Sequence, residues 1–225
     1  MTMTTTTTSG LIAQLVGVTT GVMLLTAVAQ MWRRSLVASI RLLALQGAAL
    51  AGLVAVIGAE DGDVELVWAA MLVLVVKAVA LPWALTRTAA TTRVTREQRP
   101  LVNPTAGVLA AAGLSTVAYV VSRPVVAMLP RGTGRAVPIG LALVLIGFLV
   151  LVSHRVALAQ LIGFVILDNG IAAVAFLTAG GMPLVVELGV TLDVLLVVMI
   201  LRVLTGRMLL AYGGTDLDDL RELRG

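Results

Sequence analysis

Long apolar runs dominate this chain of 225 residues. A helix needs about 20 apolar residues to cross roughly 30 Å of hydrocarbon at about 1.5 Å per residue. Runs of this kind occur seven times, at residues 11–31, 36–58, 64–86, 104–122, 136–153, 157–179 and 183–206. The sequence therefore predicts an all-α integral membrane protein with about seven transmembrane helices.

The composition agrees with a membrane protein and excludes several kinds of site. Hydrophobic residues make up 59% of the chain and charged residues only 12%, whereas soluble domains carry roughly 25% charged residues. There is no cysteine and only one histidine, His154, which excludes disulfides and cysteine-held metal centres. We expect neither metal nor cofactor in this chain. The net charge of +4 comes from loops between apolar runs and indicates orientation, with no nucleic-acid partner.

The distribution of basic residues predicts which end of each helix is cytoplasmic. With seven crossings, one side carries only Arg123, Arg131 and Arg135. The other side carries ten arginines: Arg33, Arg34, Arg87, Arg93, Arg96, Arg99, Arg155, Arg207, Arg221 and Arg224. Because short cytoplasmic loops are enriched in Lys and Arg, we expect a multi-pass protein of the inner or plasma membrane, with the N-terminus outside and the C-terminus cytoplasmic.

The order of the predicted helices suggests an internal repeat. Helices one to three and five to seven share an order of motifs, with LQGAALAG at 45–52 matching LDNGIAAV at 167–174. One helix separates the triplets, so the copies would be parallel; alternatively, the likeness is that of any two apolar triplets. The expected organisation has five parts: a Thr-rich tail (1–10), a first three-helix unit (11–87), a basic loop with a linking helix (88–135), a second three-helix unit (136–210) and a charged tail (211–225).

A few charged side chains fall inside the predicted spans. Asp168 is near the middle of the sixth span, Lys77 is deep in the third, and Asp193 and Glu187 are in the seventh. A charge at this depth costs about 2.5–3.5 kcal/mol on insertion scales, which makes such residues candidates for a functional site. His154 lies at the predicted cytoplasmic mouth of the fifth span, where it either passes protons or is simply solvated.

Two interpretations of these groups remain open. Desolvation disfavours the charged forms of carboxyls and amines, so buried ones exchange protons more readily and can form a relay. In that case Asn169 orients the neighbouring carboxylate or hydrates the path, and Gly170 admits a close helix or a water. Alternatively, the charges form buried ion pairs or hydrogen-bonded carboxyls that fix helix packing, although such pairs give a fold little net stability.

The segment from Leu167 to Leu204, LDNGIAAVAFLTAGGMPLVVELGVTLDVLLVVMILRVL, resembles the C-terminal part of the hydrogenase-4 component E (HyfE) family. That family has a pattern close to ENGIF, then MPLVVELG, then an aspartate in LLDVLV. It is similar in turn to NuoK, a three-helix subunit of complex I, and to MrpC of cation/proton antiporters. By this resemblance Asp168 stands where the family has the glutamate before NG, and Glu187 is the glutamate of VELG.

The resemblance implies a membrane-arm subunit of a complex I-like, redox-driven ion-translocating complex of the group 4 [NiFe]-hydrogenase or formate hydrogenlyase type. Its partners would be an antiporter-like subunit and the subunit at the foot of the peripheral arm. [NiFe] and iron–sulfur centres would belong to partner subunits, which makes this chain a non-catalytic part of an oxidoreductase. The implied relay comprises Asp168, Glu187, Asp193, Lys77 and His154, supported by Asn169 and Gly170. The alternatives are a structural scaffold and a free-standing small-solute transporter.

Overall fold

The computed structural model describes residues 2–33, 35–92, 103–129, 133–154 and 157–179. Within these ranges every secondary-structure element is a helix, and six helices are long and apolar enough to cross a membrane. The elements are α1 (Thr2–Trp32), α2 (Leu36–Asp61), α3 (Val64–Val73), the π-helical segment η1 (Leu74–Ala80), α4 (Leu81–Thr92), α5 (Pro104–Met128), the 3₁₀ turn η2 (Thr133–Ala136), α6 (Val137–Ser153) and α7 (Ala157–Ala179). The prediction of an all-α membrane protein is confirmed.

The described helices follow the predicted spans closely. The sixth span was expected at 157–179, the bounds of α7. The first helix, α1, begins at Thr2 and therefore includes the Thr-rich residues. The third span is one continuous rod of α3, η1 and α4, and its π-helical part was not expected. The seventh span, 183–206, lies outside the described residues together with Glu187 and Asp193.

Local chemistry explains where the helices begin and end. Gly62 closes α2 in the left-handed conformation (φ 66°), which glycine adopts without a steric penalty. The side chain of Asp63 then accepts hydrogen bonds from the backbone of Glu65 and Leu66 and caps α3. Asn103 caps α5 in the same way, with Pro104 as the first helical residue. The short polar turn between α2 and α3 therefore holds these two helices antiparallel.

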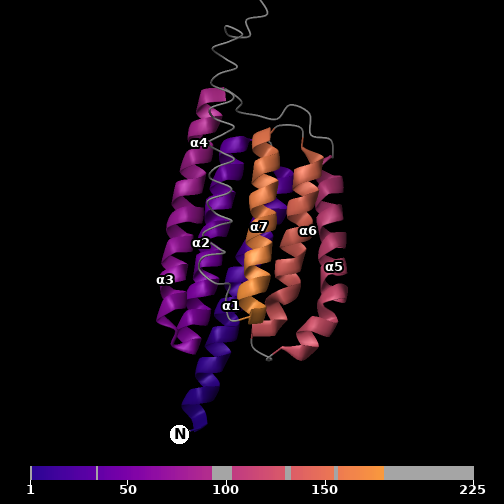
Figure 1. Ribbon diagram of the computed structural model, residues 1–225. Coiled ribbons are helices and arrows are strands. Elements are labelled where there is room, and N and C mark those ends of the chain that lie inside the picture. Colours follow the sequence, from indigo (N-terminus) through magenta and orange to yellow (C-terminus); the bar gives the residue numbers. More distant parts are fainter. Residues whose placement is uncertain (1, 34, 93–102, 130–132, 155–156, 180–225) are drawn as a thin grey trace, which may run out of the picture.

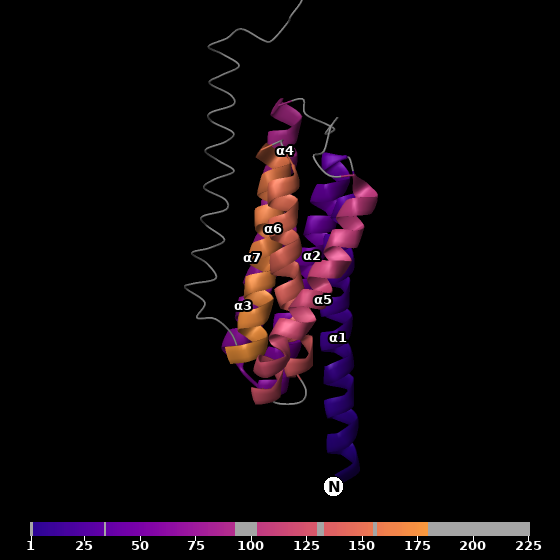
Figure 2. The same cartoon turned by 90° about the vertical axis from the view of Figure 1, so that its right-hand side faces the viewer.

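The helices form one bundle with α2 and α7 near its centre (Figure 1). The rod of α3, η1 and α4 lies at one edge and α5 at the other, while α2 contacts α1, the rod and α7. The most extensive packing joins α6 to α7. In the view turned by 90°, α1 lies on the side away from α7, and its first turns extend beyond the other helices (Figure 2).

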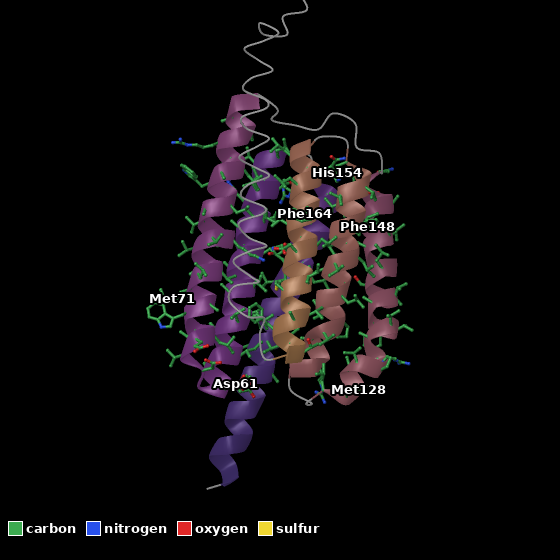
Figure 3. All side chains as sticks on the ribbon, in the orientation of Figure 1. Asp61, Met71, Met128, Phe148, His154 and Phe164 are labelled. Atoms are coloured by element: carbon green, nitrogen blue, oxygen red, sulfur yellow. The ribbon has the colours of Figure 1, made fainter. Side chains whose placement is uncertain are left out.

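The two ends of the bundle differ in their residues. Asp61 and Met128 lie at one end, which is also the end of the N-terminus, and His154 lies at the other (Figure 3). This arrangement puts the acidic turn after α2 opposite the connections that follow α1 and α6. It agrees with the alternation of helix directions that the sequence predicts.

A buried charge pair as candidate functional site

Lys77 and Asp168 form an ion pair inside the bundle. Nζ of Lys77 donates a hydrogen bond to Oδ2 of Asp168 at 2.7 Å, although the residues are 91 positions apart in the chain. Their side chains are 2% and 10% exposed. Asp168 is the twelfth of the 23 residues of α7, so the pair lies near the middle of a membrane-spanning helix. Two residues that the sequence picked out for depth alone are thus brought into contact.

The backbone around Lys77 is unusual because it is π-helical. The segment Leu74–Ala80 has Lys77 at its centre, between the regular helices α3 and α4. A π-helical turn holds an extra residue and changes the direction of the side chains that follow, and such turns are frequent at functional sites. This local geometry places the amine of Lys77 against α7.

Two amide side chains hold α7 against α1 and α2 beside the pair. Nδ2 of Asn169 donates to Oε1 of Gln46 at 3.0 Å, and Nε2 of Gln46 donates to the carbonyl of Met23 at 3.1 Å. Asn169 is only 1% exposed, and its Oδ1 has no hydrogen-bond partner among the described residues. The amide chain fixes the rotation of α7 and therefore the direction of Asp168.

Glycines allow the close approach of the helices that carry the pair. A Cβ at position 47 would lie 2.7 Å from the backbone C and O of Lys77, so Gly47 lets the π-helical segment rest directly on α2. A Cβ at position 170 would lie 2.6 Å from the backbone N of Val144. Of the two expectations for Gly170, a close helix or a water, the structure shows the close helix, α6.

His154 is not part of this contact. It ends α6, is partly buried, and its Nδ1 lies 2.9 Å from the carbonyl of Val150. The side chain of Gln160, in the first turns of α7, donates to the His154 carbonyl at 3.0 Å. Eight residues separate Gln160 from Asp168, which is about 12 Å along a helix. A small pocket beside His154 is also lined by Gln30 and Ser39.

Three of the residues that the sequence singled out are therefore adjacent: Lys77, Asp168 and Asn169. Glu187 and Asp193 lie outside the described part of the chain. Gln46 and Gly47 are site residues that were not predicted from the sequence. The sequence did contain one indication of Gln46: aligning LQGAALAG with LDNGIAAV matches Gln46 to Asp168. No group of His, Cys, Asp and Glu side chains that could hold a metal ion occurs among the described residues.

Comparison with known proteins gives relatives of two kinds. The chain is 46% identical over 211 residues to the uncharacterized protein Rv0085 of Mycobacterium tuberculosis, covering 93% of this chain and 96% of the relative. It is 28% identical over 160 residues to hydrogenase-4 component E of Escherichia coli and of Shigella flexneri, covering 71% of this chain and 74% of each relative. No family model matches the chain, and no solved structure matches it significantly.

Proposed function

Since the chain belongs to the family of the Mycobacterium tuberculosis protein Rv0085 and is distantly related to hydrogenase-4 component E, we propose that it is a membrane subunit of a hydrogenase-like, redox-driven ion-translocating complex. Redox chemistry, with any [NiFe] and iron–sulfur centres, belongs to partner subunits. Antiporter-like and peripheral-arm-foot subunits are the expected neighbours. This subunit belongs to the membrane arm, where it carries buried charges.

The observation that carries the functional part of the proposal is the contact between Lys77 and Asp168. The proton on the ammonium of Lys77 can move along the 2.7 Å hydrogen bond to the carboxylate of Asp168, which leaves a neutral amine and a neutral carboxylic acid. A charge that arrives nearby can then move the proton.

Glu187, Asp193 and His154 extend the proposed relay beyond the described pair. The two carboxylates are expected in the seventh span, while His154 lies at the end of the bundle that we propose to be cytoplasmic. Asn169 supports the relay through its contact with Gln46, which holds Asp168 in place. Ion movement through these groups would be coupled to electron transfer in the partner subunits.

A structural scaffold is the second candidate, and the same contact favours it. Each charge of a closed ion pair compensates the other, and replacing both by apolar residues of similar size often costs little stability. In this function the pair only joins the rod of α3, η1 and α4 to α7. The scaffold and the relay differ in what happens when both charges are removed together.

The test compares Asp168→Asn with the double variant Lys77→Met/Asp168→Leu in membrane vesicles that contain the assembled complex. Native gel electrophoresis measures assembly, and a pH-sensitive dye measures proton movement during electron transfer. Asp168→Asn removes one charge of the buried pair, and breaking a buried ion pair from one side costs about 3–5 kcal/mol, so assembly should fall. The double variant should assemble better than Asp168→Asn because both charges of this pair are removed together.

Proton movement in the double variant decides between the two functions. A relay requires that the assembled double variant transfers electrons while moving fewer protons per electron. Full coupling in the double variant would exclude a relay through this pair and leave the scaffold. Glu65→Gln is the matched control, because Glu65 is an exposed carboxylate at the far end of α3. It should change neither assembly nor coupling.

A further inference from the structure

Two polar levels lie in the seam between α1, α2 and α7. At the first level Nε2 of Gln30 donates to the carbonyl of Ser39 at 3.0 Å. At the second, Nε2 of Gln46 donates to the carbonyl of Met23 at 3.1 Å. Seven residues, or two helical turns of about 10.5 Å in total, separate the levels on both α1 and α2. Seven residues also separate Ile162 from Asn169 on α7, so the same face of each helix carries both levels.

The first level opens into the pocket near the end of the bundle where His154 lies (Figure 3). Its lining includes Gln30, Arg33, Ser39, His154 and Ile162, so that α1, α2, α7 and the end of α6 contribute. Its volume of about 20 Å³ is sufficient for a water molecule. Polar side chains from several helices supply the hydrogen-bonding groups that such a water needs. The second level carries the amide of Asn169, next to Asp168.

An apolar layer separates the two levels. Leu43 follows Ser39 by four residues and precedes Gln46 by three, and Ile166 has the same spacing between Ile162 and Asn169. Leu43 and Ile166 are 1% and 0% exposed, and Ala27, which lies between Met23 and Gln30 on α1, is 0% exposed. The seam is therefore polar at the pocket, apolar for about two turns, and polar again at the charge pair.

We propose that this pocket is the water-filled entrance to the Lys77–Asp168 pair, and that Leu43 and Ile166 form an apolar gate between them. The proposal rests on the relay function and names the end of the bundle from which the pair is supplied. A narrow apolar constriction excludes water and so blocks proton transfer. Movement of the two side chains admits a short chain of waters from Ser39 to Asn169, and protons then reach Asp168 from the side of Arg33 and His154.

The absence of cysteine from the chain allows each level to be probed by one introduced thiol. The variants Ser35→Cys, Ser39→Cys, Leu43→Cys and Gln46→Cys are treated with a charged, membrane-impermeant thiosulfonate in vesicles that expose the His154 end, and the rates of modification are compared. Such a reagent needs a water-filled path. Ser35→Cys is exposed and serves as the standard for reactivity. Ser39→Cys should react at a rate within about tenfold of this standard. If the open gate is a minor state, Gln46→Cys should react about 10- to 1,000-fold more slowly than the standard.

Ile166→Ala added to Gln46→Cys tests the gate itself. The shorter side chain should raise the rate of modification by about tenfold or more, up to the limit set by a fully open state. Ile146→Ala is the matched control, since Ile146 is also fully buried but belongs to α6. It should leave the rate unchanged.

Three results would overturn the proposal. The first is that Ser39→Cys reacts as slowly as Leu43→Cys. The second is that Gln46→Cys reacts fast without Ile166→Ala. The third is that Ile166→Ala and Ile146→Ala accelerate the reaction of Gln46→Cys equally. The accessibility of the thiols is measured without electron transfer, so failure of the gate proposal can be distinguished from failure of the proposed function. Full coupling in Lys77→Met/Asp168→Leu rejects the relay whatever the labelling pattern is.

Discussion

Gln46 touches two helices through one side chain. Its amide nitrogen binds the carbonyl of Met23 in α1, and its amide oxygen binds Asn169 in α7. A buried amide that loses its partner keeps its desolvation cost, whereas removing both partners can be nearly neutral. At the scale of single residues, this shared amide is therefore the feature that ties the position of Asp168 to α1 and α2.

The variant Gln46→Leu should destabilise the chain by about 1–3 kcal/mol, because Asn169 keeps a buried amide without its acceptor. Asn169→Leu in the same background should cost less than it does alone, with a coupling of about 0.6 and at most about 1.7 kcal/mol. Thermal unfolding of the full chain in detergent micelles, followed by circular dichroism, measures all three variants. Strictly additive losses would mean that the two amides do not interact.

The contact between α2 and η1 belongs to the scale of whole elements. The π-helical segment rests on Gly47, where an added Cβ would lie 2.7 Å from the backbone of Lys77. Both neighbours at this point are backbone atoms, which cannot rotate away as a flexible side chain can. The position of Lys77 thus depends on a helix–helix distance that only glycine permits.

Gly47→Ala should destabilise the chain by about 1–3 kcal/mol, because the π-helical segment has to move away from α2. The control is Gly113→Ala in α5, where nothing lies within 4 Å of the added Cβ. Alanine is the better helix former there, so the control should be neutral or more stable by up to about 1 kcal/mol. Thermal melts of the two variants are compared side by side. Equal stability would mean that the contact between Gly47 and the π-helical segment does not stabilise the bundle.

The predicted elements and the predicted contacts differ in how far the sequence determines them. The length of an apolar run determines a span, and for this reason α7 has the predicted bounds. The pairing of Lys77 with Asp168 depends on how each helix is rotated, and helices that are apolar all round carry no pattern that gives this rotation. The segment LVVKAVA at 74–80 has neither glycine nor proline to indicate a π-helical turn. The role of Gln46 could not be predicted from the sequence because it depends on the contact of its side chain with α7.

At the scale of the whole molecule, α2 and α7, which are the second helices of the two proposed repeats, run in the same direction. The start of α2 and the start of α7 line the same pocket, and Gln46 meets Asn169 about two turns further along both helices. Parallel copies require this direction. The parallel course of α2 and α7 therefore supports our proposal that residues 11–87 and 136–210 are related units, joined by 88–135.

The orientation of the molecule in its membrane can be measured because the chain contains no cysteine. The sequence predicts ten arginines on the side of Arg33 and only three on the side of Asp61, and Lys and Arg are retained on the cytoplasmic side. Asp61→Cys should therefore react with an impermeant maleimide added to intact cells, whereas Arg33→Cys should react only in inverted vesicles. Both side chains are exposed at the ends of helices, so poor access of the thiol does not account for a difference. The reverse pattern would place the pocket beside His154 outside, and the proposed relay would then take up its protons from the external medium.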